Sequence, residues 1–171
     1  GKTTLALELI GCLKSRGLRI GAAKFTHHDL DAPDTDTARM ARAGASVAGL
    51  GQSGTALFWQ GKRFLPDLIP LLDCDVLIVE GGKSLGWLPR ILCPRQAAEV
   101  SELTPALALG VWGEATASGL PALTDVGALA DLVLERGFAL PGLDCGGCGR
   151  ESCAALAGEI VAGQAALTDC V

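Results

Sequence analysis

The chain begins with Gly1-Lys2-Thr3-Thr4, the closing half of the phosphate-binding sequence G-x-x-x-x-G-K-[ST]. Apolar residues at helical spacing follow at once and predict a helix over residues 3–16. A loop that runs straight into a helix presents free backbone N–H groups and the positive end of the helix dipole to an anion. We therefore expect Lys2 to reach the β- and γ-phosphates of a nucleotide and the Thr3 hydroxyl to ligate Mg²⁺.

Only the second half of that loop is present in the sequence. The first Gly of the motif, the residues that follow it and the strand that normally feeds the loop would all precede Gly1, and the chain does not start with Met. We therefore expect the sequence to be a truncated product or a fragment of a longer protein. The alternative interpretation is a Gly-Lys pair that happens to precede an ordinary surface helix.

A second strong feature is an apolar run that ends in an acid. Residues 76–79 are all Val, Leu or Ile, and Glu80, Gly81 and Gly82 follow them. Such a run predicts a central, buried parallel strand. An acid at the end of that strand holds Mg²⁺ directly or through water in P-loop proteins, and the glycines let the backbone approach the nucleotide closely. An ordinary buried strand with a charged end is the alternative.

The other elements complete an α/β pattern. A loop, helix and strand in succession indicate a crossover unit, so we expect a mostly parallel sheet with flanking helices. The turn over residues 51–54 predicts a hairpin. The remaining predicted elements are strands at 18–25, 45–50, 55–59, 87–93 (an edge strand because of its Pro) and 107–112, and helices at 37–43, 66–72 and 125–136.

A polar loop over residues 26–37 carries both histidines and several carboxylates. It follows the strand predicted at 18–25, and ligands of open α/β sheets bind beyond the carboxyl ends of the strands. We interpret Asp36 as a catalytic acid near Mg²⁺, and His28 and Asp29 as contacts of the nucleotide. The alternative is a solvated loop in which Thr35 or Asp36 only caps the next helix.

Charge and cysteine usage exclude several classes of protein. A net charge of -5 argues against nucleic acid or an anionic membrane as the main partner, and no apolar run is long enough to span a membrane. Of the seven cysteines, Cys12, Cys74 and Cys93 are scattered in apolar surroundings and predicted to be core residues. The other four crowd the end of the chain, which favours a metal cluster in a cytoplasmic protein over a secreted disulfide scaffold.

Those four cysteines have the spacing C-x2-C-x4-C-x16-C. Four thiolates are the usual ligands of a [4Fe–4S] cluster, and the glycines between them allow tight turns with N–H groups aimed at sulfur. Ser152 would cap a helix over residues 154–162 that returns the chain to the site. A zinc site, which more often uses two C-x2-C pairs, and two disulfides are the alternatives. The predicted ligands are Cys145, Cys148, Cys153 and Cys170.

Together these motifs resemble those of the MobB family of molybdopterin-guanine dinucleotide biosynthesis proteins. The matching stretches, within residues 1–137, are GKTTLALELIGCLKSRG, KFTHHDLDAPDTDTARMARAGA and DVLIVEGGKS with PR-I after it. The resemblance implies a GTP-binding P-loop domain over residues 1–138 that assists the nucleotidyltransferase which attaches GMP to molybdopterin. It also implies a homodimer, weak GTPase activity and a molybdoenzyme as a further partner.

Residue by residue, the resemblance implies phosphate contacts from the first four residues, Mg²⁺ at Thr3 and Glu80, and Asp36 nearby. The choice of GTP over ATP rests on the resemblance, because the chain has no N-K-x-D guanine signature. Two departures stand out. The family usually has Gly-Lys-Asp where this chain has residues 34–36, and it often has an aromatic residue at Gly82. The residues implied for the phosphates are Gly1, Lys2, Thr3 and Thr4.

Residues 143–171 resemble the small four-Cys [4Fe–4S] domain of the RnfB electron-transport protein and of the corrinoid iron–sulfur protein. We therefore expect an iron–sulfur domain over residues 139–171. Two other functions fit the same motifs. One is a redox or electron-transfer protein driven by ATP or GTP, and the other is a P-loop metallochaperone that delivers metal to an apoenzyme.

Overall fold

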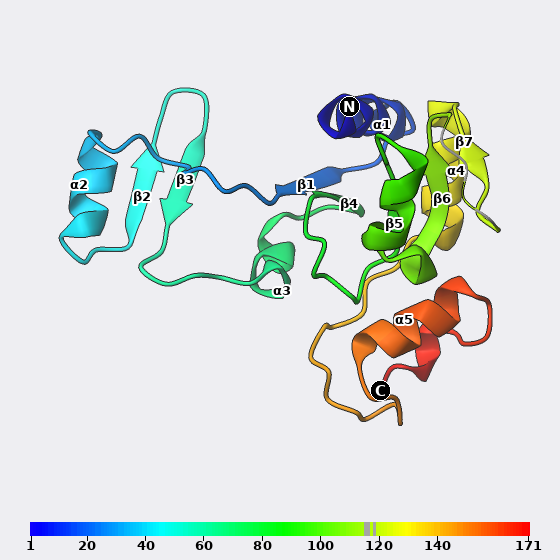
Figure 1. Cartoon of the computed structure of the whole chain (residues 1–171). Coiled ribbons are helices and arrows are strands. Elements are labelled where there is room, and N and C mark those ends of the chain that lie inside the picture. The colour runs from blue at the N-terminus through cyan, green and yellow to red at the C-terminus, as the bar shows by residue number, and fades with distance from the viewer. Residues whose placement is uncertain (115–116, 118) are drawn as a thin grey trace. The chain divides into compact units, whose positions relative to one another are not determined.

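The chain folds into two units, one made of Gly1–Lys24 with Cys74–Val171 and the other of Phe25–Asp73. The structure, a computed structural model, describes residues 1–114, 117 and 119–171 (Figure 1). The boundary expected after residue 138 lies inside the first unit, so the division into 1–138 and 139–171 stays a prediction. Each unit is described by itself.

Helix α1 (Lys2–Ser15) begins the first unit. Leu5, Leu9 and Leu13 recur every four residues, so they lie on one face of the helix, and all three are buried. The helix ends as predicted, because Gly17 adopts a φ of +82°, which glycine reaches without steric cost.

Five parallel strands follow in this unit among the described residues. β1 (Ile20–Lys24) pairs with β4 (Val76–Glu80), and β5 (Arg90–Leu92), β6 (Ala108–Trp112) and β7 (Ala122–Leu123) form a second sheet. The predicted parallel pairing is therefore correct. The prediction of a central, buried strand at β4 is wrong: each of its residues is half-buried, and β1 is the one strand that pairs with it in the described part of the chain.

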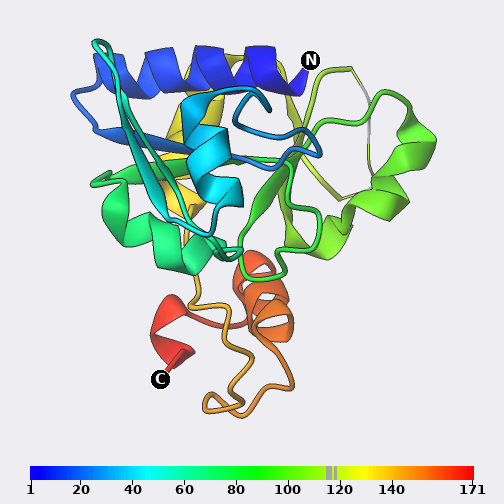
Figure 2. The ribbon, with the colours of Figure 1, turned by 90° about the vertical axis from the view of Figure 1, so that its left-hand side faces the viewer.

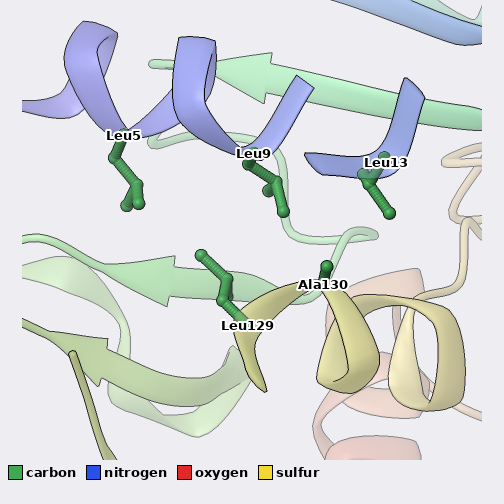
Figure 3. Close-up of a cluster of buried hydrophobic side chains, with 5 residues drawn as sticks. All are labelled: Leu5, Leu9, Leu13, Leu129 and Ala130. Atoms are coloured by element: carbon green, nitrogen blue, oxygen red, sulfur yellow. The ribbon is translucent and has the colours of Figure 1, made fainter. Parts of the chain in front are cut away.

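The core of the first unit lies between α1 and α4 (Val126–Arg136), whose first turn is capped by the Asp125 carboxylate. Figure 3 shows the three leucines of α1 pointing toward Leu129 and Ala130 of α4. Side chains from all five parallel strands pack against the same cluster, so it joins both parallel sheets to the two helices. These strand residues are Ile20, Val76, Ile78, Ile91, Trp112 and Leu123.

The C-terminal part of the first unit holds α5 (Cys153–Val161) and a 3-10 turn, η4 (Leu167–Asp169). Ser152 caps α5 by accepting the N–H of Ala155, as predicted. The Arg136 guanidinium at the end of α4 donates to the Val161 carbonyl at 2.8 Å, and α5 also packs on η3 (Pro105–Leu107). Figure 2 shows α5 and the chain end as the orange and red segments.

The second unit contains α2 (Asp36–Arg42), a hairpin and a short helix. Strands β2 (Val47–Leu50) and β3 (Thr55–Phe58) pair antiparallel across the predicted turn. The predicted helix at 66–72 divides into α3 (Leu65–Leu68) and the 3-10 turn η1 (Ile69–Leu71).

Several local features were not expected from the sequence. The 3-10 segment η2 (Ala97–Leu103) and strand β7 were not predicted, and the strand predicted from residue 87 begins only at Arg90, after Pro89. A proline has no N–H for a ladder, which explains the late start. Within the described residues, no helix combines the length and the apolar composition that crossing a bilayer requires.

We predict that Leu13→Ala lowers the free energy of unfolding by about 2–5 kcal/mol, because it leaves a cavity in the α1–α4 core. Leu13 is 0% exposed, whereas Leu7 on the same helix is 64% exposed and provides the matched control. Leu7→Ala should change the stability by less than about 0.5 kcal/mol. Urea unfolding monitored by circular dichroism compares the two variants, and equal losses would mean that α1 is not anchored by this face.

Candidate functional site

The first turn of α1 meets the end of β4 through a side-chain hydrogen bond. The Thr3 hydroxyl donates to Glu80 Oε1 at 2.7 Å, although the two residues are 77 positions apart in the chain. From the sequence, both residues are predicted to serve the same magnesium ion, and the structure brings them together. Hydroxyl and carboxylate oxygens are hard ligands of the kind Mg²⁺ prefers, so this pair fits a magnesium site.

Lys24 is the third member of this group. β1 and β4 run parallel with Lys24 opposite Glu80, and the Lys24 Nζ lies 3.4 Å from Glu80 Oε1. The hydrogen bond from Thr3, and then the positive charge of Lys24, lower the pKa of Glu80, so its carboxylate is ionised at neutral pH. This ion pair was not predicted from the sequence. The sequence feature that could have indicated it is a charged residue at the end of each strand, Lys24 in β1 and Glu80 in β4.

The start of α1 offers backbone donors next to this group. The first intrahelical bond runs from the Leu5 N–H to the Gly1 carbonyl, so the amides of residues 2–4 come before any intrahelical acceptor. A cavity of about 170 Å³ opens beside Thr3, Lys24 and Glu80, between α1 and strands β1 and β4. Its other lining residues are apolar, namely Ala6, Leu7, Ile10, Ala22, Ala23 and Ile78.

Cys93, just after β5, lies near Lys2 at the start of α1. Burial raises the pKa of its thiol, while the charge of Lys2 acts in the opposite direction. Cys12 and Cys93 pack against the leucine cluster, as expected for core cysteines. The proximity of Cys93 to Lys2 was not visible in the sequence, because it depends on how β5 and α1 come together.

The other predicted nucleotide contacts belong to the second unit, so their grouping with Glu80 stays a prediction. Asp36 is the first residue of α2, and its carboxylate lies 3.4 Å from the Arg39 guanidinium. The His28 backbone N–H donates to the Thr26 hydroxyl at 3.1 Å, and Asp29 is exposed. The capping role considered for Thr35 is present, since its hydroxyl accepts the Ala38 N–H.

Asp31, which the sequence analysis did not single out, forms hydrogen bonds within the loop before α2. The two carboxylate oxygens of Asp31 accept hydrogen bonds from the hydroxyls of Thr35 and Thr37 at 2.9 and 2.8 Å. These contacts hold the entry to α2 within the second unit.

The thiols of Cys145, Cys148 and Cys153 lie close enough to Cys170 to interact with it electrostatically. Burial first, and then the proximity of Cys148, Cys153 and Cys145, raise the pKa of the Cys170 thiol. Asp144 holds the third cysteine from two sides: its N–H donates to the Cys153 sulfur at 3.4 Å, and its carboxylate accepts the Cys153 N–H at 2.6 Å. Hydrogen bonds to sulfur are a usual outer layer of thiolate sites.

Arg150 connects the separate segments of the tail. Its guanidinium donates to the Glu159 carboxylate at 2.9 and 3.0 Å and to the Cys148 carbonyl at 2.9 Å, and it lies 3.9 Å from Asp169. The loop between the cysteines, α5 and η4 are thus joined by one side chain. Sequence reasoning did not single out Arg150, because only the fold shows which acids face it.

The donor chemistry of the tail suits soft metals. In residues 1–114, 117 and 119–171, no three His, Cys, Asp or Glu side chains converge on a point where one metal ion could bind. Four thiols with backbone N–H groups nearby are the donor set that thiolate metal sites use.

Two protein-family models match the chain. Residues 1–111 match the model described as "Molybdopterin guanine dinucleotide synthesis protein B", or MobB. Residues 140–171 match the model described as "Putative Fe-S cluster". Both resemblances inferred from the sequence are confirmed.

Curated relatives match part of the chain. A molybdopterin-guanine dinucleotide biosynthesis adapter protein of Escherichia coli K12 is 36% identical over 93 residues, which are 48% of this chain and 53% of that protein. A relative from Methanocaldococcus jannaschii is 32% identical over 100 residues, or 56% of this chain and 41% of that protein. The chain spans about half the length of the curated relatives it matches.

Solved structures share the fold. Bacillus subtilis MobB has a TM-score of 0.62 and 24% identity, covering 79% of this chain and 90% of that one. A crystal structure of molybdopterin-guanine biosynthesis protein B has a TM-score of 0.61 and 22% identity, covering 78% and 90%. These structures confirm the predicted α/β fold. Because the MobB model covers more than half of the sequence, the chain belongs to the MobB family, with a segment of an iron–sulfur family at its C-terminal end.

Proposed function

We propose that this protein is a cytoplasmic GTP-binding adapter of molybdopterin guanine dinucleotide synthesis, with slow GTPase activity and a [4Fe–4S] cluster in its tail. The observation that carries the nucleotide site is the hydrogen bond between Thr3 and Glu80. It supports a shared magnesium site where α1 begins and β4 ends. When bound there, Mg²⁺ would neutralise charge on the β- and γ-phosphates.

The residues of this site have separate roles in the proposal. Lys2 and the first amides of α1 bind phosphate oxygens, and Thr3 supplies a hydroxyl ligand. Glu80 remains ionised because Thr3 and Lys24 lower its pKa, so it can orient the metal and its waters at neutral pH. Asp36 is the proposed catalytic acid near Mg²⁺, and His28 and Asp29 are the proposed contacts of the nucleotide.

The adapter role rests on the relatives, two of which are described as biosynthesis adapter proteins. The proposed partners are the nucleotidyltransferase that attaches GMP to molybdopterin and a molybdoenzyme that receives the product. A homodimer is part of the proposal. Pull-down of the nucleotidyltransferase from a defined mixture tests this role, and no association with or without GTP would contradict it.

We predict that Lys2→Ala weakens GTP binding by at least about ten-fold, because it removes a charge-assisted hydrogen bond to phosphate. Titration calorimetry should use a chain that carries the whole G-x-x-x-x-G-K-[ST] loop. Lys14→Ala, in the last turn of the same helix, is the matched control and should bind GTP like the wild type. Equal affinity for wild type and Lys2→Ala would remove the phosphate-loop assignment.

We predict that Glu80→Gln keeps nucleotide binding but lowers GTP hydrolysis by about 10- to 100-fold, the usual cost of losing a group that orients a metal site. The amide keeps the shape but loses the charge that attracts Mg²⁺. Phosphate release under single-turnover conditions measures the effect, with Glu8→Gln on exposed α1 surface as the control. Unchanged turnover would mean that Glu80 is only a charge at the end of a strand.

We predict that anaerobically purified protein contains about four iron atoms per chain and is brown, as expected for a [4Fe–4S] cluster with four thiolate ligands. Replacing any of the four tail cysteines with Ser should reduce the iron content, whereas replacing Cys12, Cys74 or Cys93 should not. Chelation should also loosen residues 143–171 more than the rest of the chain. One zinc per chain without iron would contradict the cluster and assign the tail a structural role.

The tail also supports a second candidate, a redox or electron-transfer protein driven by ATP or GTP. The match of residues 140–171 to an iron–sulfur family is the observation that favours it. Nucleotide-dependent reduction of the cluster by dithionite, followed by absorbance, would favour this function, whereas reduction at the same rate without nucleotide would exclude it.

A further inference from the structure

A short segment connects Glu80 to the surface on which the iron–sulfur tail is docked. Trp87, seven residues after Glu80, is 8% exposed, and its carbonyl accepts the Leu140 N–H at 3.2 Å. A Cβ atom on Gly142 would lie 2.7 Å from the indole Nε1, so the indole packs directly on the backbone there. The tail is therefore held at Trp87 by both a hydrogen bond and close packing.

Gly86 makes a similar contact with the helix of the tail. A Cβ atom on Gly86 would lie 2.7 Å from the Cβ of Ala154, in the first turn of α5. This distance is shorter than van der Waals contact allows, so the backbone of residue 86 and α5 approach as closely as a glycine permits. A movement of residues 86 and 87 would thus displace α5 directly.

The other end of the segment carries two adjacent glycines, which we call the hinge. Gly81 and Gly82 have φ values of +91° and +68°, in the region that glycine enters freely. Such residues can absorb a change of backbone direction at little cost. They directly follow Glu80, whose Oε1 atom accepts from Thr3 and lies 3.4 Å from the Lys24 ammonium.

Between the hinge and Trp87 the segment is braced. Arg90 donates to the Leu85 carbonyl at 2.7 Å and to the Lys83 carbonyl at 3.3 Å, and the Leu85 N–H donates to the Gly82 carbonyl at 2.9 Å. These bonds hold residues 82–85 in one shape, directly before the two residues that contact the tail.

We propose that residues 81–87 couple the nucleotide site to the iron–sulfur tail, so that bound GTP and Mg²⁺ change the docking of α5. The inference rests on the proposed nucleotide site. A ligand that draws on the Thr3 hydroxyl and the Glu80 carboxylate replaces contacts that now hold the end of β4, and the hinge begins at the next residue. Coupling between sites is reciprocal. An occupied iron–sulfur site must therefore change the affinity for GTP by the same factor by which bound GTP changes the affinity for the cluster.

Hydrogen exchange followed by mass spectrometry tests the coupling, in a chain that carries the whole phosphate loop. Adding GTP with Mg²⁺ should change exchange over residues 140–162 of the tail, including the Leu140 amide. Titration calorimetry should show GTP affinities of the iron-loaded and iron-free protein that differ by at least about five-fold, the lower end of common allosteric coupling.

A pair of variants tests the contact itself. Gly86→Ala places a methyl group against Ala154, so it should abolish the exchange response and bring the affinity ratio close to one. Adding Ala154→Gly to that variant makes room for the methyl group and should restore both. Gly11→Ala is the control, because its Cβ would meet no atom within 4 Å.

The outcomes separate this inference from the proposed function. GTP binding with no exchange response in the tail and equal affinities with and without iron overturns the coupling and leaves the nucleotide site standing. No GTP binding at all overturns both. A wild-type response in Gly86→Ala means that the signal does not pass through this contact, and it contradicts the proposed path.

Discussion

The burial of one face of α1 is the interaction on which the proposed nucleotide site depends. Leu5, Leu9 and Leu13 are withdrawn from water against α4 and the strands, and each contributes roughly 1.5–3 kcal/mol. A helix is stiff, so fixing this face also fixes the first turn. The Thr3 hydroxyl can therefore meet Glu80 at hydrogen-bond distance, although the contacts that position it extend three turns along the helix.

Three features of the fold determine the surroundings of Glu80. The parallel register of β1 and β4 sets Lys24 opposite it, the helix brings Thr3 to it, and the chain leaves it through two glycines with positive φ. The hydrogen bond from Thr3, and then the charge of Lys24, lower the pKa of Glu80, so the fold holds this carboxylate in its ionised form.

The iron–sulfur tail packs as part of the first unit. Trp87, Gly86 and Arg136 each hold it through backbone contacts, and Arg150 joins its own segments through Glu159 and the Cys148 carbonyl. Two of these residues, Gly86 and Trp87, belong to the segment that follows Glu80, so the tail packs directly on that segment.

Much of the fold could be predicted because it is encoded locally. Helical spacing of leucines, a cap at Ser152 and an apolar run before Glu80 act over a few residues, so the main helices and strands and the two families could be inferred from the amino-acid order alone. Other features are set by long-range packing. The half-buried β4, the Lys24–Glu80 pair and the contact between Gly86 and Ala154 depend on which edges and faces meet across long stretches of chain, and no local pattern records that choice.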